Sequence, residues 1–517
     1  MLPPRSRKTA RLVWISVFVT ALALSAWPQK NRAKKPTAVT SAEQRAARYF
    51  ESVRNQPLLL HAFLQAMPKG GDLHNHLSGA VYAESFIKWA AQDGLCVSTS
   101  SLTLVQPPCD PAAFRPPAGA ALEDPDLYGR LLDAFSMRQF HPGPESGHDH
   151  FFATFGKFGA ATNGRTAEML AEVRSRAAAG HLQYMELMFN PDGGAAGRLG
   201  AQLGWNDDLA KMRDQLLAGG LPQIVTGAGK FLDETENKEN QGLRCGTPQA
   251  NPGCFVQVRY LYQVARGVPK AAVFAQILAG FEMASRDPRV VGLNLVMAED
   301  WPVPIRDFNL HMQMLDFLHG LYPKVHITLH AGELTPQLVS PEELFHIRAS
   351  ILRGHAERIG HGVDVMQESD PEALLHMMAE RSVLVEICLT SNDVILNVTG
   401  ARHPLPMYLR FGVPVALATD DQGVSRGDIT QEYQRAAETY GLTYQQLKRF
   451  ARNSLYYSFL PGQSMWAANK DWKVRQCEHD KPPVRPSPAC EDFLSSNEKA
   501  RMEWVLEKVF SEFESKF

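Results

Sequence analysis

Short apolar runs alternate with longer stretches of helical periodicity along most of the chain. Near-continuous apolar strands joined by helices are typical of a parallel sheet covered on both faces, so the pattern predicts an α/β fold. Eight repeats favour closure into a (β/α)8 TIM barrel, with a doubly wound open sheet as the alternative. The predicted strands span Gly70 to His76, Leu182 to Leu187, Val256 to Tyr262, Val290 to Val296, Val325 to His330, Arg358 to His361, Val383 to Cys388, and Val413 to Thr419.

Two connections, residues 90 to 181 and 190 to 255, are too long for simple crossovers and are predicted as long insertions after the first two strands. A helix is expected from about Ser41 to Gln65, and another from about Asn497 to Phe517 after a Pro-rich charged segment. The expected divisions are 1–26 signal peptide, 27–66 N-terminal linker and helix, 67–460 barrel and 461–517 C-terminal helical appendage.

The N-terminus has the layout of a secretory signal peptide. Basic residues precede an apolar run from Leu12 to Ala26, which predicts cleavage after Ala26 and export to the periplasm or the exterior. The run falls short of the roughly 20 residues that cross a bilayer, so an uncleaved anchor is only the alternative, and no stable membrane anchor is expected.

Export makes the seven cysteines candidates for disulfides. Cys388 ends an apolar run and is predicted to be a buried thiol. The other six form three pairs of near neighbours, and free thiols in a reduced protein are the alternative. The predicted bridges are Cys96 with Cys109, Cys245 with Cys254, and Cys477 with Cys490.

A formal net charge of -2 gives no electrostatic reason to expect nucleic acid as a partner, because phosphate-backbone binding needs a concentrated positive surface. A hydrophobic share of 44% is normal for a soluble globular protein with a large core.

Chemically capable side chains stand where predicted strands end, which is where barrel enzymes gather their catalytic groups. His74 and His76 lie two apart on one strand and therefore point to the same side. With His330 and Asp420 at two other strand ends, three imidazoles and a carboxylate make a set suited to Zn²⁺, with a position left for water.

The motifs His74-Asn-His76, His330-Ala-Gly-Glu333, Arg358-Ile-Gly-His361-Gly, Thr390-Ser-Asn392 and Thr419-Asp-Asp421 occur in the order seen in adenosine deaminases. The chain resembles that family over roughly residues 67 to 460. Its export signal and early insertion look more like the secreted, growth-factor-related branch than the compact cytosolic enzymes.

The resemblance implies one Zn²⁺ per chain, held by His74, His76, His330 and Asp420. It also implies hydrolysis of adenosine or 2'-deoxyadenosine to the inosine form with release of ammonia. The residues implied to be catalytic are Glu333 as the protonated acid near purine N1, His361 beside the attacking water, and Asp421 towards purine N7. The structural alternatives are a core histidine for His361, a helix-initial glutamate for Glu333 and a helix cap for Asp421.

Two departures from the family pattern fall where the substrate is expected. Ser78 stands where many members have an acidic residue near the ribose, and Met297 replaces a glycine whose N–H meets the purine. Another aminopurine or an N6-modified adenine therefore remains an alternative substrate, and a secreted binding or signalling protein is the alternative from another class. Glu299 is either a supporting residue or a solvated loop residue.

Four further features are given no catalytic role. The histidines at 141, 148 and 150, with Glu145 and Asp149, are expected in a solvated loop, and a second metal site is the alternative. The Gly-rich stretch at 217–230 lacks a dinucleotide fingerprint. Asn397-Val-Thr399 fits an N-glycosylation pattern, and the long insertion is a candidate for homodimer contacts.

Overall fold

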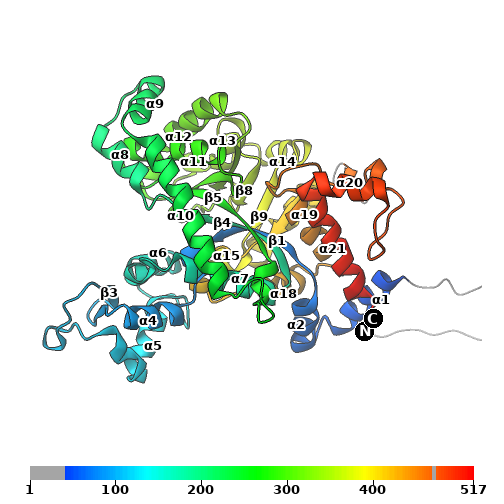
Figure 1. The fold of residues 1–517 in the computed structure, drawn as a ribbon, viewed down its shortest axis with the longest axis horizontal. Coiled ribbons are helices and arrows are strands. Elements are labelled where there is room, and N and C mark those ends of the chain that lie inside the picture. Colours follow the sequence, from blue (N-terminus) through cyan, green and yellow to red (C-terminus); the bar gives the residue numbers. More distant parts are fainter. Residues whose placement is uncertain (1–40, 468–472) are drawn as a thin grey trace, which may run out of the picture. The chain divides into compact units, whose positions relative to one another are not determined.

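The barrel sheet of the computed structural model contains eight parallel strands in the order β1-β4-β5-β6-β7-β8-β9-β10 among the described residues, 41–467 and 473–517 (Figure 1). The predicted signal peptide and its cleavage site after Ala26 lie outside this range. The strands are β1 (Gly70–His76), β4 (Leu182–Phe189), β5 (Gln257–Ala265), β6 (Val290–Val296), β7 (His326–Ala331), β8 (Arg358–His361), β9 (Leu384–Ile387) and β10 (Val415–Leu417).

The last strand returns to the first at the residues that carry chemistry. The N–H of Asp420 donates to the carbonyl of His74 at 2.8 Å, and Asn75 forms a parallel bridge with Asp420. The sheet therefore closes into the predicted (β/α)8 barrel, and closure itself brings Asp420 beside the His74-Asn75-His76 segment.

Helices cover the outside of the barrel between successive strands. Buried apolar side chains of these helices join those of the strands in one core cluster. The helices between strands β5 and β10 are α11 (Lys270–Ala284), α12 (Pro302–Leu321), α13 (His346–Leu352), α14 (Pro371–Glu380), α15 (Leu389–Leu396) and α16 (Leu405–Phe411). The last strand is followed by α17 (Gln422–Ser425), α18 (Ile429–Tyr440) and α19 (Tyr444–Tyr456).

The interior of the barrel contains a buried ionic layer below the strand ends. Arg358 donates to Glu186 at 2.5 Å and to Glu386 at 2.6 Å, and all three side chains are buried. A buried arginine between two carboxylates is tolerated because each charge has a partner. The other carboxylate oxygen of Glu386, Oε2, lies 2.7 Å from Nδ1 of His74 and so connects this ionic layer to the strand ends.

The two predicted insertions are mostly helical. The β1–β4 connection contains α3 (Leu77–Ala80), α4 (Ala83–Gln92), α5 (Pro125–Ala134), α6 (Gly147–Phe158) and α7 (Thr166–Ala179), and the β4–β5 connection contains α8 (Ala195–Leu203), α9 (Leu209–Ala218) and α10 (Leu221–Gly242). The sequence did not predict a small antiparallel hairpin, β2 (Cys96–Ser98) with β3 (Thr103–Val105). Strands of three residues are too short to show an alternating pattern.

The ends of the described unit differ in detail from the expected helices. The single helix expected at 41–65 is two helices, α1 (Ala42–Val53) and α2 (Pro57–Ala66), because Pro57 starts a new helix after the extended Gln56. At the other end are α20 (Pro488–Ser496) and α21 (Glu498–Glu514). Lys448 of α19 bonds both Glu43 of α1 and Glu514 of α21, so these three helices pack together.

The three predicted disulfides are confirmed: Cys96 to Cys109, Cys245 to Cys254, and Cys477 to Cys490. Cys388 is a buried free thiol, as expected. Three bridges in one chain suggest an oxidising compartment. Among the described residues, none of the helices has both the length and the apolar character needed to span a bilayer.

Candidate active site

A cavity of about 190 Å³ opens at the carboxyl ends of the barrel strands. Its floor carries His76, His330, Asp420, Asp421 and Glu333. Its wall is apolar and combines side chains from α6 with side chains that follow β6: Phe151, Phe152, Phe155, Met297 and Trp301. The first long insertion therefore contributes directly to the cavity.

Four side chains converge on one point at the cavity floor. The Nε2 atom of His330 lies 3.0 Å from Nε2 of His74 and 3.2 Å from Nε2 of His76. Oδ1 of Asp420 lies 3.6 Å from Nε2 of His74 and 3.3 Å from Nε2 of His76. Ligands about 2.0–2.1 Å from one tetrahedral ion lie about 3.3 Å apart, so these spacings fit a shared divalent cation.

The outward-facing atoms of the four residues are all held by neighbours. Nδ1 of His74 bonds Glu386, Nδ1 of His76 bonds Gln263 at 3.2 Å, and Nδ1 of His330 bonds Asn294 at 2.9 Å. Ser391 donates to Oδ2 of Asp420 at 2.7 Å. Because oxygen acceptors hold each Nδ1–H, the Nε2 lone pairs face the common point.

The chemistry of this donor set also calls for a cation. Three imidazole lone pairs directed at one another repel, and the buried Oδ1 of Asp420 has no hydrogen-bond donor among the described residues. A divalent ion would satisfy all four atoms at once. Three nitrogen ligands and one carboxylate oxygen are a set that suits Zn²⁺.

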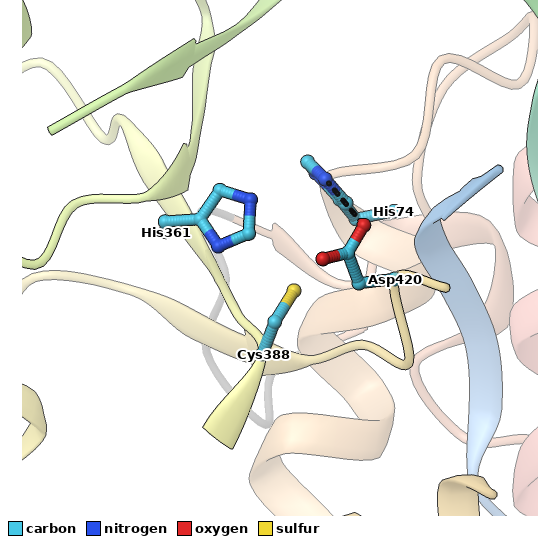
Figure 2. A group of neighbouring side chains, drawn as sticks. All are labelled: His74, His361, Cys388 and Asp420. Atoms are coloured by element: carbon cyan, nitrogen blue, oxygen red, sulfur yellow. Dashed lines mark ion pairs between the residues drawn. The ribbon is translucent and has the colours of Figure 1, made fainter. Parts of the chain in front are cut away.

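A second group of possible ligands shares two of these residues and adds His361 and Cys388 (Figure 2). It is less suitable, because Asn392 donates its amide N–H to Nδ1 of His361 at 3.0 Å. The neutral ring then carries its proton on Nε2 and offers no lone pair there. Burial raises the pKa of the Cys388 thiol well above its usual range, so that residue also lacks a ready ligand atom.

Glu333 and Asp421 are buried carboxyl groups at the edge of this centre. In the part of the chain that the structure describes, Oε1 of Glu333 and Oδ1 of Asp421 have no hydrogen-bond partner. Burial and then the neighbouring Asp420 raise the pKa of each carboxyl well above its usual range. Asp421 fits here only because residue 79 is a glycine, since a Cβ there would lie 1.5 Å from its Oδ1.

Glu333 is positioned through its backbone. Glu299 is buried, accepts the N–H of Gly332 at 3.2 Å and that of Glu333 at 2.9 Å, and bonds His346 at 2.5 Å. The structure therefore places Glu299 behind Glu333, and the solvated-loop alternative for Glu299 is wrong.

Ser78 and Met297 both line the cavity. Met297 has φ +85°, a left-handed conformation that costs a side chain of this kind about 1–3 kcal/mol. The buried Arg266 holds it by donating to the Met297 carbonyl at 3.0 and 3.1 Å and to the His330 carbonyl at 3.1 Å. The Arg266 guanidinium thus joins the pocket wall at Met297 to the end of β7 at His330.

Sequence reasoning missed Arg266 and the residues that orient the imidazoles. Those residues are Gln263, Asn294 and Glu386, and all lie on strands. Buried polar residues inside apolar strand runs were the available signal, because such groups need partners.

The histidine cluster of the first insertion differs from the expected solvated loop. His148 and His150 lie on α6, which begins where Ser146 accepts the N–H of Asp149 at 3.0 Å. His148 is buried and bonds Asp300, in the segment after β6, at 3.0 Å. His141 is exposed in the preceding loop. The cluster therefore joins α6 to the segment that follows β6.

Comparisons with known proteins agree with this architecture. Residues 222–467 match the adenosine deaminase family model. The adenosine deaminase of Escherichia coli strain SMS-3-5 is 40% identical over 136 residues, covering 26% of this chain and 38% of that protein. The adenosine deaminase of Pectobacterium atrosepticum is 27% identical over 393 residues, covering 76% of this chain and 93% of that protein.

Two solved structures are also similar. The adenine deaminase of Arthrobacter aurescens has 18% identity and a TM-score of 0.48, with 76% of this chain and 94% of that chain covered. The N6-methyl-AMP deaminase of Arabidopsis thaliana has 20% identity and a TM-score of 0.49, with 77% and 94% covered.

The barrel and its His/Asp cluster define a protein with the fold of the metal-dependent hydrolases. Within that class, residues 222–467 are similar to the adenosine deaminase family, and the similarity to the Pectobacterium atrosepticum adenosine deaminase extends over 76% of this chain. The match spans 38% of the length of the Escherichia coli relatives.

Proposed function

We propose that the chain is an exported, zinc-dependent hydrolase that converts adenosine or 2'-deoxyadenosine to the inosine form and releases ammonia. The observation that carries the proposal is the convergence of three imidazole nitrogens and Oδ1 of Asp420 beside two buried carboxyl groups in one cavity. One metal ion and an acid near it are the groups that this hydrolysis requires.

His74, His76, His330 and Asp420 would hold the ion. Zn²⁺ lowers the pKa of a coordinated water from about 15.7 to about 7 and so supplies a nucleophile at neutral pH. The chain's own contribution is to fix the four ligand atoms through Glu386, Gln263, Asn294 and Ser391. Such partners keep the imidazoles in the binding tautomer.

Glu333 is the proton donor of the proposed reaction. Water attacking C6 of the purine moves electron density to N1, and a carboxyl that is still protonated at neutral pH neutralises it there. The raised pKa of buried Glu333 fits this role. Asp421 would bond purine N7. The water oxygen becomes the 6-oxo group and loses two protons. One goes to the amino nitrogen, which leaves as ammonia, and the other restores the Glu333 carboxyl after its proton has passed to N1.

The lining of the cavity favours an uncharged nucleoside over a nucleotide. Among the described residues, neither arginine nor lysine lines it, and a phosphate group binds best to such cations. The aromatic residues of α6 and Trp301 instead offer faces against which a purine or a sugar can pack.

Met297 and Ser78 keep a second candidate substrate open, namely another aminopurine or an N6-modified adenine. Met297 places a thioether where the family pattern has a glycine, and Ser78 offers a hydroxyl in place of a carboxylate near the ribose. Both changes reshape the substrate pocket and leave the metal centre alone.

The test is a spectrophotometric assay of the mature protein with adenosine, 2'-deoxyadenosine, N6-methyladenosine and AMP, with and without a zinc chelator. Loss of the 6-aminopurine absorbance that stops with chelator and returns with Zn²⁺ is the expected result, with AMP the poorest substrate. No turnover of any of the four by a zinc-loaded sample would overturn the proposal in favour of a binding protein on this scaffold.

A further inference from the structure

A chain of hydrogen bonds leads from the backbone at α16 to His361. It starts at Leu405, whose N–H donates to Nδ1 of His403 at 3.1 Å. A backbone N–H can only donate, so Nδ1 of His403 must carry the lone pair. Burial, followed by nearby Arg435, lowers the pKa of His403 to about 4, so the ring is neutral and carries its proton on Nε2.

The second link is the Asn392 side chain. Nε2 of His403 lies 3.1 Å from Oδ1 of Asn392, and Nδ2 of Asn392 lies 3.0 Å from Nδ1 of His361. Because His403 offers a proton, the oxygen of the amide must face it and the NH₂ group must face His361. The amide orientation, which often has to be guessed, is therefore fixed by a backbone donor.

The third link follows from the same rule. Nδ1 of His361 accepts a hydrogen bond, so the neutral ring has its proton on Nε2. That atom is buried and has no hydrogen-bond partner within residues 41–467 and 473–517. Figure 2 shows the ring of His361 directed from β8 towards His74 and Asp420. An N–H donor thus faces the metal-binding point.

We propose that Asn392 and His403 are positioning residues that fix His361 as a hydrogen-bond donor towards the attacking water, and not as the acceptor of its proton. The inference rests on the proposed hydrolytic function. A donor at this position holds the water oxygen in place for attack and stabilises negative charge that develops on it.

The sequence of α15 and α16 explains why the chain of bonds is rigid. Asn392, His403 and His361 are all buried, at 0%, 3% and 0% exposure. The φ of His361 is +67°, and Gly362 follows it with φ +59°. A Cβ at Gly362 would meet the Tyr408 hydroxyl of α16 at 2.4 Å. The same helix that begins beside His403 therefore also packs against the turn that holds His361.

The decisive variant is Asn392→Asp. A carboxylate has nearly the same shape but only accepts, so it would take protons from both His403 and His361 and move the His361 proton to Nδ1. In the zinc-loaded variant we expect the ¹⁵N resonance of His361 Nδ1 to become that of a protonated nitrogen and the resonance of Nε2 to become that of an unprotonated one. We also expect kcat to be lower by about 10²-fold or more, with KM little changed.

The control is Asn453→Asp, another buried amide changed to a carboxylate. Asn453 lies on α19 and donates to the Val415 carbonyl at 2.8 Å. It has no link to the His361 chain, so the His361 resonances should stay as in the wild type even if stability falls. This comparison separates the loss of stability caused by a buried charge from the effect of changing the His361 tautomer.

The wild-type spectrum tests the inference even if Asn392→Asp does not fold. A protonated Nδ1 on His361 in the zinc-loaded wild type would overturn it, and so would unchanged His361 resonances or unchanged kcat in folded Asn392→Asp. If the wild type shows the expected tautomer but turns over no purine, the proposed function fails while the assignment of the hydrogen-bond chain stands.

Discussion

The carboxylate of Glu299 accepts the backbone N–H of Glu333 at 2.9 Å, so one buried acid supports the main chain of another. His346 bonds the same carboxylate and stacks on Phe308 with ring centroids 3.6 Å apart. The Glu333 carboxyl therefore stands on a segment held by a buried carboxylate and its hydrogen bonds, while its own Oε1 has no hydrogen-bond partner among the described residues.

Replacing Glu333 by Gln should remove most turnover and leave the metal in place. The amide keeps the shape but cannot transfer a proton to the purine, and no metal ligand changes. We expect kcat to fall by about 10²–10⁴-fold. Steady-state kinetics and metal analysis on the same sample test this, and full activity in the variant would exclude Glu333 as the proton donor.

Asp420→Ala should instead lower the metal content. Oδ1 of Asp420 is the only carboxylate oxygen among the four proposed ligand atoms, and Ser391 alone cannot replace it. Loss of an outer-shell partner already costs about 10–100-fold in affinity, so loss of a ligand should cost at least as much. Metal analysis after dialysis measures it. Asp393→Asn on nearby α15 is the control, and equal zinc in Asp420→Ala and wild type would refute the ligand set.

The contact between His148 and Asp300 should make α6 sensitive to pH. Burial alone would lower the pKa of His148, but its bonds to Asp300 and Asp149 raise it above the usual value. A raised pKa means that the stabilisation is complete below the unfolded pKa of about 6.5 and is lost as the pH rises through the folded value.

As the pH rises, amide hydrogen exchange in α6 should therefore accelerate by more than the normal increase of the chemical exchange rate with pH. KM should also increase, because α6 carries three wall residues of the cavity. Asp300→Asn should weaken this pH dependence, because only the bond to Asp149 would then raise the pKa of His148. Exchange in α10, which has no such contact with the cavity wall, provides the internal reference. A variant that retains the wild-type pH profile would show that the contact does not hold α6.

Met297→Gly should widen the range of purines accepted. Glycine adopts φ +85° without strain, which offsets part of the lost thioether packing, so the stability should change little. We expect kcat/KM for N6-substituted purines to rise by about tenfold. Met297→Leu keeps both volume and strain and is the matched control. Equal selectivity in all three proteins would show that residue 297 does not limit the pocket.

Peptide mapping without reductant should find three bridges and one free thiol, Cys388. The double change Cys477→Ser and Cys490→Ser, which opens a 13-residue separation, should lower the free energy of unfolding by about 3 kcal/mol. Denaturant unfolding measures this. Cys388→Ala should retain all three bridges, and mixed pairings in the wild type would contradict the assigned connectivity.

The sequence by itself determined the order of the eight strands, the chemistry at their ends and the three disulfides. Those features depend on local patterns: apolar runs of strand length, His74 and His76 two residues apart, and cysteines nine or thirteen residues apart.

Only the tertiary structure decided which polar residues support the site. Asn294 and Glu386 are far in sequence from His330 and His74, the residues that they bond. Asp300 likewise bonds His148 at a sequence separation of 152 residues. Such pairs form because barrel closure buries polar groups that then need partners, and no local pattern encodes which partner each one finds. The proton on His361 is decided in the same way, through a backbone N–H at Leu405.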